Sequence, residues 1–236
     1  VPTITSAETG DADANGRIDR LVITFDKAVD IADGDAGDGL PQIAVTGYTV
    51  ANADYAAAGV TTLTLTLTES GGPDTDATPA VTFTNDGDVT DSSTNADAAN
   101  YGPTAATDAA GPAIVTASTV TTTTVLVTFS EPVDDGSLVA GDFTFSSFAT
   151  GAANAVAAGL ASGTVDDNEV TLTLAAEIGP EETGAVAFSA GGAAADLAAG
   201  ANTSTQTSTI TVTDGIAAVP TITSAETGDA DANGRI

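Results

Sequence analysis

The stretch TTLTLTLTES, residues 61–70, decides the fold class of this chain. Threonine and leucine alternate through most of it, so every second side chain is apolar. Successive side chains of a β-strand point to opposite faces, and a period of two therefore indicates one face on a core and the other in water. Threonine is β-branched, which favours the same conformation. The stretch predicts a half-buried antiparallel strand.

The same alternation recurs along the chain. It is present in VLVTFSEPV at residues 125–133, in EVTLTLAAEI at 169–178 and in STITVTD at 208–214. These segments are short and rich in β-branched residues, as strands of antiparallel sheets are. We therefore expect an all-β protein.

A weak internal duplication divides the chain into two halves. RLVITFDKAVD at residues 20–30 parallels VLVTFSEPVDD at 125–135, and each follows a segment that begins at a proline, Pro2 or Pro112. Further along, TTLTLTLTES parallels EVTLTLAAEI, and PAVTFTNDG parallels GAVAFSAGG. Each half has about 110 residues and some seven short strands, the size of an Ig-like β-sandwich. We expect two tandem Ig-like antiparallel sandwich domains, residues 1–111 and 112–218.

The first eighteen residues, VPTITSAETGDADANGRI, recur without change at residues 219–236. Identical segments at a fixed offset are typical of tandem arrays. Residues 219–236 are therefore expected to be the first strand of a third domain. Its apolar face needs either the rest of that domain or strand addition to a neighbouring molecule, so the expected partners are copies of the same repeat.

The net charge of −29 comes from 33 acidic residues against four basic ones. Phosphate binding needs clustered Lys and Arg, so the composition excludes nucleic acid and anionic membrane surfaces as partners. Abundant short carboxylates suit a surface that stays hydrated in concentrated salt, which screens self-repulsion. A halophilic source is the favoured interpretation, and an acidic secreted protein of a calcium-rich setting is the alternative.

The residue types that are absent narrow the function. The chain has no Cys and no His, and its one lysine is Lys27, so catalytic triads, thiolate or imidazole metal ligands and most general bases are excluded. We expect no enzyme. No apolar run is long enough to span a bilayer, so no membrane insertion is expected within this segment.

Two motifs of the second half resemble a known family. VTFSEPVD at residues 127–134, followed by GDFTFSSF at 141–148, is similar to the Ig-like repeats of prokaryotic S-layer proteins, haloarchaeal ones included, and of large surface adhesins. The first half departs from that pattern with Lys27 and Ala28 in place of a Glu/Asn-Pro pair, and with an acidic insertion at residues 30–39. The resemblance implies extracellular, noncatalytic modules strung in series at the cell surface.

The segment GDADANGRID, residues 10–19, has the spacing of a calcium loop. Counted from Asp11, short oxygen ligands stand at alternate positions and glycine stands at the sixth. Such a loop can wrap a hard cation that prefers six to eight oxygens. The segment resembles the D-x-D-x-N-G-x-x-D loops of dockerin-like and thrombospondin-like repeats, whereas Val22 at the twelfth position excludes an EF-hand. The expected ligands are Asp11, Asp13, Asn15, the Arg17 carbonyl and Asp19, with Glu8 and Asp26 as lesser candidates. The alternative is a plain hairpin, because Asn-Gly alone is a strong type I′ turn signal.

Three further segments carry weaker signals. The acidic run at residues 30–39, with Asp30, Asp33, Asp35 and Asp38, matches no coordination pattern and is interpreted as a solvated loop, and so is the run at 86–97. Asn202 begins an N-x-S sequon, which a surface glycosylation system would modify if the source has one.

The sandwich topology predicts where the calcium loop lies. The connection between the first and second strands is near the exit pole of an Ig-like domain, so residues 10–19 should approach the Gly111–Pro112 junction, where Asp108 can add an oxygen. The equivalent loop of the second half, residues 118–124, has no acid. The sequence thus favours a calcium-stiffened structural repeat of a stalk, filament or surface layer. An adhesive or carbohydrate-binding module is the alternative, which acidic loops on an exposed face away from the joints would favour.

Overall fold

The computed structural model describes residues 1–32, 40, 42–54, 58–69, 71–217, 222–228 and 232. The protein is all-β, and its helices within these residues are three single 3₁₀ turns, η1 (Asp135–Ser137), η2 (Ala140–Asp142) and η3 (Gly151–Ala153). Among the residues described, no helix has the length and apolarity needed to cross a bilayer. The strands are β1 (Ile4–Gly10), β2 (Arg20–Ile31), β3 (Ile43–Val45), β4 (Val50–Asp54), β5 (Val60–Leu67), β6 (Ala80–Phe83), β7 (Val89–Asp91), β8 (Tyr101–Ala105), β9 (Ile114–Thr121), β10 (Thr124–Phe129), β11 (Phe143–Ser146), β12 (Gly159–Ala161), β13 (Glu169–Thr173), β14 (Gly184–Phe188) and β15 (Ile210–Thr213).

Strands β1 to β8 build the N-terminal module. One sheet has the order β1-β2-β5-β4, with β7 paired to the far end of β2, and the other has the order β3-β6-β8. These are the ABED and CFG sheets of a seven-stranded Ig-like sandwich, with β7 as an additional strand. A parallel bridge between Glu8 and Thr107 links the first strand to the end of the module.

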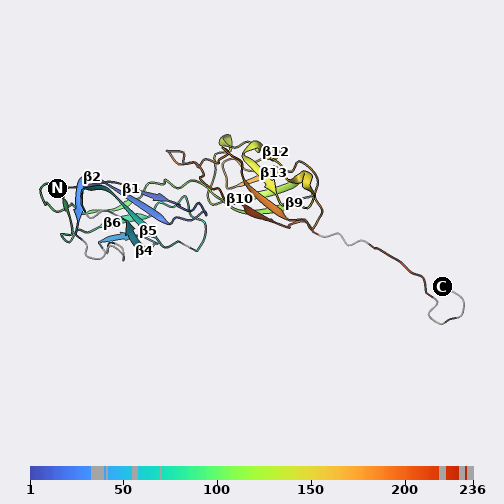
Figure 1. Cartoon of the computed structure of the whole chain (residues 1–236), viewed down its shortest axis with the longest axis horizontal. Coiled ribbons are helices and arrows are strands. Elements are labelled where there is room, and N and C mark those ends of the chain that lie inside the picture. Colours follow the sequence, from blue (N-terminus) through green and yellow to red (C-terminus); the bar gives the residue numbers. More distant parts are fainter. Residues whose placement is uncertain are drawn as a thin grey trace.

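Strands β9 to β15 build the C-terminal module with the same connectivity. Its sheet has the order β11-β14-β15-β9-β10-β13-β12, in which β9 pairs with β10 antiparallel and with β15 parallel. The first strand therefore joins the CFG half to the ABED half in one continuous sheet over one core. The two modules lie end to end along the long axis of the molecule (Figure 1).

Each module has its own apolar core. The core of the N-terminal module runs in sequence from Ile4 to Ala106, and that of the C-terminal module from Ile114 to Val212. In the C-terminal core the Phe143 ring lies 6.4 Å from the ring of Phe129 and 5.4 Å from that of Phe188, measured between centroids. Such aromatic pairs add stabilisation beyond the area that they bury.

The predicted alternation is confirmed where the strands form. In β5 the side chains of Leu63, Leu65 and Leu67 are buried, whereas the threonines between them face outward. Strands β5 and β13 both pair with the second strand of their module, which is the equivalence that the internal duplication predicts.

The SEPV segment differs from its prediction. Residues 125–133 were expected to be one strand, but β10 ends at Phe129, and Ser130 and Glu131 are buried polar residues beyond its end. Pro132 has no N–H to donate to a ladder, which is the physical reason for the early end.

The described part of the C-terminal copy of the repeated segment belongs to none of the sheets. Residues 222–228 are in no strand, their side chains are exposed, and Ile222 is 88% accessible to solvent. This segment extends away from the C-terminal module (Figure 1). Packing of this segment as a strand of that module would have contradicted the expected boundary near residue 218, and the described residues do not pack in that way.

Asp91 at the end of β7 gives an acid-dependent contribution to stability. It is buried and its Oδ1 accepts hydrogen bonds from the Ser93 N–H, the Ser93 hydroxyl and the Thr94 N–H, at 2.9, 2.7 and 3.0 Å. The Ser93 bonds, opposed by burial, lower the pKa of Asp91 to about 2.

We expect Asp91→Asn to change the pH dependence of melting. A folded-state pKa below the unfolded value stabilises the fold above pH ~4, and this contribution is lost as the pH falls from about 4 to 2. The parent chain should therefore lose more melting temperature over that range than Asp91→Asn does, in thermal melts at a series of pH values. Parallel profiles for the two proteins would contradict the role of Asp91.

Candidate calcium loop and module junction

Residues 11–19 form an open loop between β1 and β2. A two-residue Asn-Gly hairpin is not formed, because β1 ends at Gly10 and β2 begins at Arg20. The two oxygens of Asp11 instead accept hydrogen bonds from the N–H groups of Asn15, at 3.2 Å, and Gly16, at 2.7 Å. The loop is thus wrapped around a carboxylate, and β1 and β2 pair as antiparallel neighbours without a two-residue Asn-Gly turn.

Three of the predicted ligands converge in this loop. Asp11, Asp13 and Asp19 each offer a carboxylate oxygen, and these oxygens lie within 4.8 Å of one another. A calcium ion about 2.4 Å from each ligand requires ligand oxygens no more than about 5 Å apart, so the separation fits. Burial, together with the hydrogen bond and charge of Asp13, raises the pKa of Asp11 against the lowering by two backbone N–H groups. A bound cation would relieve this crowding of negative charge.

Glu69 contacts the side chains of Asn15 and Arg17. Its Oε1 accepts a hydrogen bond from the Asn15 Nδ2, at 2.9 Å, and its Oε2 is 3.4 Å from the Arg17 Nη1. The Arg17 guanidinium is therefore paired outside the carboxylate group, and its charge does not occupy the space between the three aspartates. Glu69 follows directly after β5, and the motif spacing gave no signal of its role.

Asp74 ties the loop to the rest of the module. Its Oδ1 accepts the Ile18 N–H at 2.8 Å, and its Oδ2 accepts the Tyr48 hydroxyl at 2.6 Å. Burial and this hydrogen bond to Asp74 raise the pKa of Tyr48. The Asp74 N–H in turn donates to the Gly16 carbonyl at 3.1 Å. Asp74 is far from the loop in sequence, and only the fold brings the two together.

The loop packs against the C-terminal module. Gly16 is buried at φ +94°, and a Cβ on it would lie 2.6 Å from Val115 Cγ1 and 3.1 Å from Ser130 Cβ. Beside it, the buried hydroxyls of Thr75 and Ser130 are hydrogen-bonded at 2.6 Å across the two modules. The expected position of the loop at the junction is thus confirmed.

Asp108 does not join the loop. Its carboxylate groups with those of Glu131 and Asp196, at the C-terminal side of the junction. Glu8 and Asp26 also lie outside the loop group, and Asp26 accepts a hydrogen bond from the Thr3 N–H at 2.7 Å instead. The reason for the position of Asp108 is that the chain beyond β8 runs on toward the C-terminal module.

Asn202 has a structural role at the same junction. Its Nδ2 donates to Asp196 Oδ2 at 2.7 Å and to the Asp108 carbonyl at 3.2 Å. Both amide hydrogens thus have acceptors, and attachment of a glycan would replace one of them. This geometry argues against glycosylation of Asn202 in the folded protein.

The other acidic segments show no convergence in the described residues. Asp30 accepts hydrogen bonds from the Gly59 N–H and the Ser92 hydroxyl. Asp33, Asp35 and Asp38 lie outside the described residues. In the run at 86–97, Asp86 accepts from the Gln42 amide.

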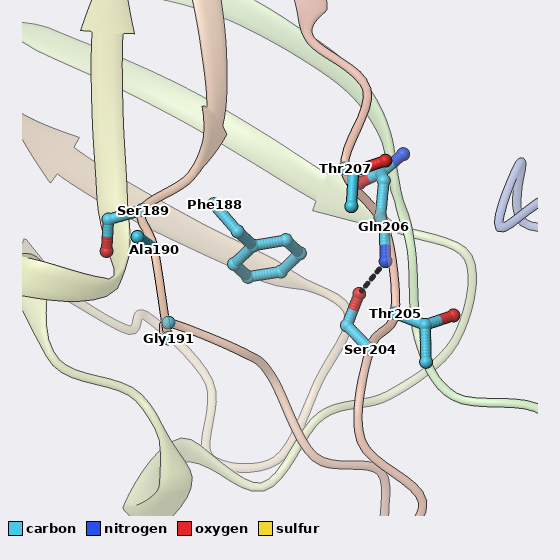
Figure 2. Close-up of a pocket in the computed structure, with 9 residues that line it drawn as sticks. Phe188, Ser189, Ala190, Gly191, Ser204, Thr205, Gln206 and Thr207 are labelled. Carbon is cyan, nitrogen blue, oxygen red and sulfur yellow. Dashed lines mark hydrogen bonds between the residues drawn. The ribbon is translucent and has the colours of Figure 1, made fainter.

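A hollow in the C-terminal module bears on the carbohydrate-binding alternative. It has a volume of about 310 Å³ and is lined by residues 188–192 and 204–207. Figure 2 shows the Phe188 ring between the two lining segments, opposite Gln206 and Ser204. The Gln206 amide is already bonded to both the N–H and the carbonyl of Ile114, at 2.9 and 3.0 Å. The lining has no charged residue and its one amide side chain is engaged, so the groups left to contact a ligand are the Phe188 ring and the Ser and Thr hydroxyls.

Comparisons with family models, with curated proteins and with solved structures found no match for this chain.

Proposed function

We propose that this chain is a noncatalytic structural repeat of an extracellular surface protein, in which calcium stiffens the junction between consecutive Ig-like modules. The proposal covers a stalk, filament or surface layer built from copies of residues 1–218. The acidic surface would keep such an assembly hydrated in concentrated salt, as in a halophile.

The loop of residues 11–19 is the proposed calcium site. The carboxylates of Asp11, Asp13 and Asp19 would hold the ion, with the Asn15 side chain and the Arg17 carbonyl as further oxygen ligands. The ion supplies positive charge among crowded carboxylates and fixes the loop conformation. Because the loop contacts the next module through Gly16, a fixed loop also fixes that contact.

The position of the loop is the observation that carries the proposal. Its buried Gly16 packs on Val115 and Ser130 of the C-terminal module. An adhesive or sugar-binding calcium site needs an exposed face, where a ligand can reach the ion. Here the contact with the neighbouring module is made by Gly16, while the side chains of Asp13 and Asn15 are exposed, so it is the junction contact of the loop that supports a structural role.

We expect calcium to stabilise the N-terminal module, and Asp11→Asn with Asp13→Asn to remove the part of this effect that the loop ion supplies. Calcium that binds the folded loop but not the unfolded chain adds RT ln(1 + [L]/Kd) to the free energy of unfolding. This is about 2.7 kcal/mol at a hundredfold excess of calcium over Kd. That corresponds to a rise of roughly 10–20 °C in the melting temperature of a domain of this size. Tyrosine fluorescence is a selective readout, because the three tyrosines, Tyr48, Tyr55 and Tyr101, all belong to the N-terminal half.

Asp166→Asn with Asp167→Asn is the matched control. It makes the same change in charge at neighbouring acids of the C-terminal module that are not part of the loop group. Its calcium-dependent rise in the tyrosine-detected melt should equal that of the parent chain. An undiminished rise in the loop variant would remove Asp11 and Asp13 from the calcium site and defeat the proposal for the loop.

A further inference from the structure

A second group of carboxylates meets at the junction from three distant parts of the sequence. Asp108 comes from the segment after β8, Glu131 from the end of β10, and Asp196 from the connection between β14 and β15. Their ligand oxygens lie within 4.8 Å of one another. The group is separate from the calcium loop and contains none of its residues.

Burial distinguishes this group from an ordinary acidic patch. Glu131 and Asp196 are each only 3% accessible, and Asp108 is half-buried. In the part of the chain that the structure describes, the buried Glu131 Oε1 has no hydrogen-bond partner. An ionised carboxylate taken out of water is strongly destabilised where one of its oxygens has no partner, so a cation beside this oxygen would stabilise the ionised form.

No basic side chain among the described residues neutralises the group. Arg17 pairs with Glu69 and Lys27 with Asp91. Arg20 lies over Gly10 instead, since a Cβ on that glycine would be 2.8 Å from its Nε. Arg235, the remaining basic residue of the sequence, is outside the described residues. Three carboxylates therefore share one largely buried space with no protein cation beside them.

Neighbouring hydrogen bonds hold two of the three carboxylates in position. Asp196 Oδ1 accepts the Asn202 N–H at 2.8 Å and its Oδ2 accepts the Asn202 Nδ2 at 2.7 Å. Asp108 Oδ1 accepts the Ala110 N–H at 3.1 Å. Outer hydrogen bonds of this kind orient carboxylates at metal sites.

Two carboxyl groups of this cluster have raised pKa values. Burial, and then the charges of Asp108, Asp196 and Asp76, raise the pKa of Glu131 to about 8, against a lowering by a hydrogen bond with Thr75. Burial, and then the charges of Asp196 and Asp76, raise the pKa of Asp108 to about 6, against a hydrogen bond from Ala110.

We propose that Asp108, Glu131 and Asp196 bind one calcium ion at the junction, in addition to the ion of the loop. The donors are all hard oxygens, and their separation suits metal–oxygen distances of about 2.4 Å, as calcium prefers. The ion ties the segment that leaves the N-terminal module to two buried side chains of the C-terminal module. It therefore locks the end of the connecting segment, whereas the loop ion stiffens the neighbouring contact that Gly16 makes with Ser130.

The test is calcium titration of the chelator-treated chain of residues 1–236 by calorimetry. The four forms compared are the parent chain, the Asp11→Asn, Asp13→Asn variant, and that variant with either Glu131→Gln or Glu181→Gln added. Glu131→Gln keeps the shape of the side chain and removes its charge. In the Asp11→Asn, Asp13→Asn background, one calcium ion per chain should still bind at the junction. Adding Glu131→Gln to that background should lower the remaining affinity at least about tenfold. Glu181→Gln, the same change at an exposed acid, should leave it unchanged.

The outcomes separate this site from the loop. Loss of all calcium binding in the Asp11→Asn, Asp13→Asn protein would overturn the junction site and leave the proposed function intact. Unchanged binding on adding Glu131→Gln would also overturn it. If the loop substitutions leave calcium binding unchanged and only the addition of Glu131→Gln weakens it, the junction site is supported and the loop is not a calcium site. Folding of each variant is checked by its circular dichroism melt in chelator, in which Glu131→Gln should melt no lower than the parent, because it removes a buried carboxylate that has one oxygen without a hydrogen-bond partner.

Discussion

Replacing Phe143 with alanine is expected to destabilise the C-terminal module by about 3–5 kcal/mol and to leave the N-terminal module folded. Phe143 is fully buried, and its ring packs against the rings of Phe129 and Phe188. Truncation removes those contacts and leaves a cavity that the surrounding strands fill only in part. The melt followed by circular dichroism should gain an early phase, more than about 10 °C below that of the parent.

Tyrosine fluorescence tests whether the two modules unfold separately. All three tyrosines are in the N-terminal half, so the tyrosine-detected melt of Phe143→Ala should stay close to that of the parent chain. The matched change in the other core is Phe83→Ala, since Phe83 is also buried, at 1% exposure. It should move the tyrosine signal strongly. Equal shifts of the tyrosine signal in both variants would mean that the chain unfolds as one unit.

The strands were predictable because their signal is local. Leu63, Leu65 and Leu67 alternate with threonines, and period-two alternation decides which face is buried without knowledge of any distant segment. The internal duplication was predictable for the same reason, since equivalent strands keep equivalent patterns. The additional strand β7 was missed because its three residues, Val89–Asp91, are too short to show a period.

The same difference between local and distant sequence signals separates the two candidate sites. Asp11, Asp13 and Asp19 are close in sequence, so their spacing alone predicted that their carboxylates would converge. Glu131 and Asp196 gave no such signal, because they meet only through the path of the sheet. The sequence correctly predicts that Asp108 lies at the junction, but it wrongly groups Asp108 with the ligands of the loop. Its actual partners are buried acids, which composition alone would have placed in solvent.

Gly16 is constrained both by the local conformation of the loop and by the distant residues that it contacts at the junction. It is the sixth residue of the loop pattern, where glycine permits the sharp turn, and the sequence assigned it that role. The structure adds a second requirement, because its Cα faces Val115 and Ser130 of the other module. A side chain at residue 16 would therefore affect both the backbone of the loop and the packing of the junction.

Gly16→Ala is expected to cost roughly 2–5 kcal/mol and to loosen the junction. An L-residue at φ +94° accounts for about 1–2 kcal/mol of that figure. A methyl group 2.6 Å from Val115 Cγ1 accounts for about 1–3 kcal/mol more, because one of the two segments must move. The tyrosine-detected melting temperature should fall, and small-angle scattering should show a broader distribution of distances between the modules.

Gly87→Ala separates the two causes. Gly87 has φ +107°, but a Cβ on it would meet nothing within 4 Å, so this variant carries the backbone strain without the contact. It should lose stability by the smaller amount and keep the scattering profile of the parent. Val115→Ala added to Gly16→Ala removes the obstructing Cγ1 and should restore the packing part of the loss. If Gly16→Ala behaves like Gly87→Ala and Val115→Ala restores nothing, the loop does not brace the neighbouring module, and calcium binding there would stiffen the loop alone.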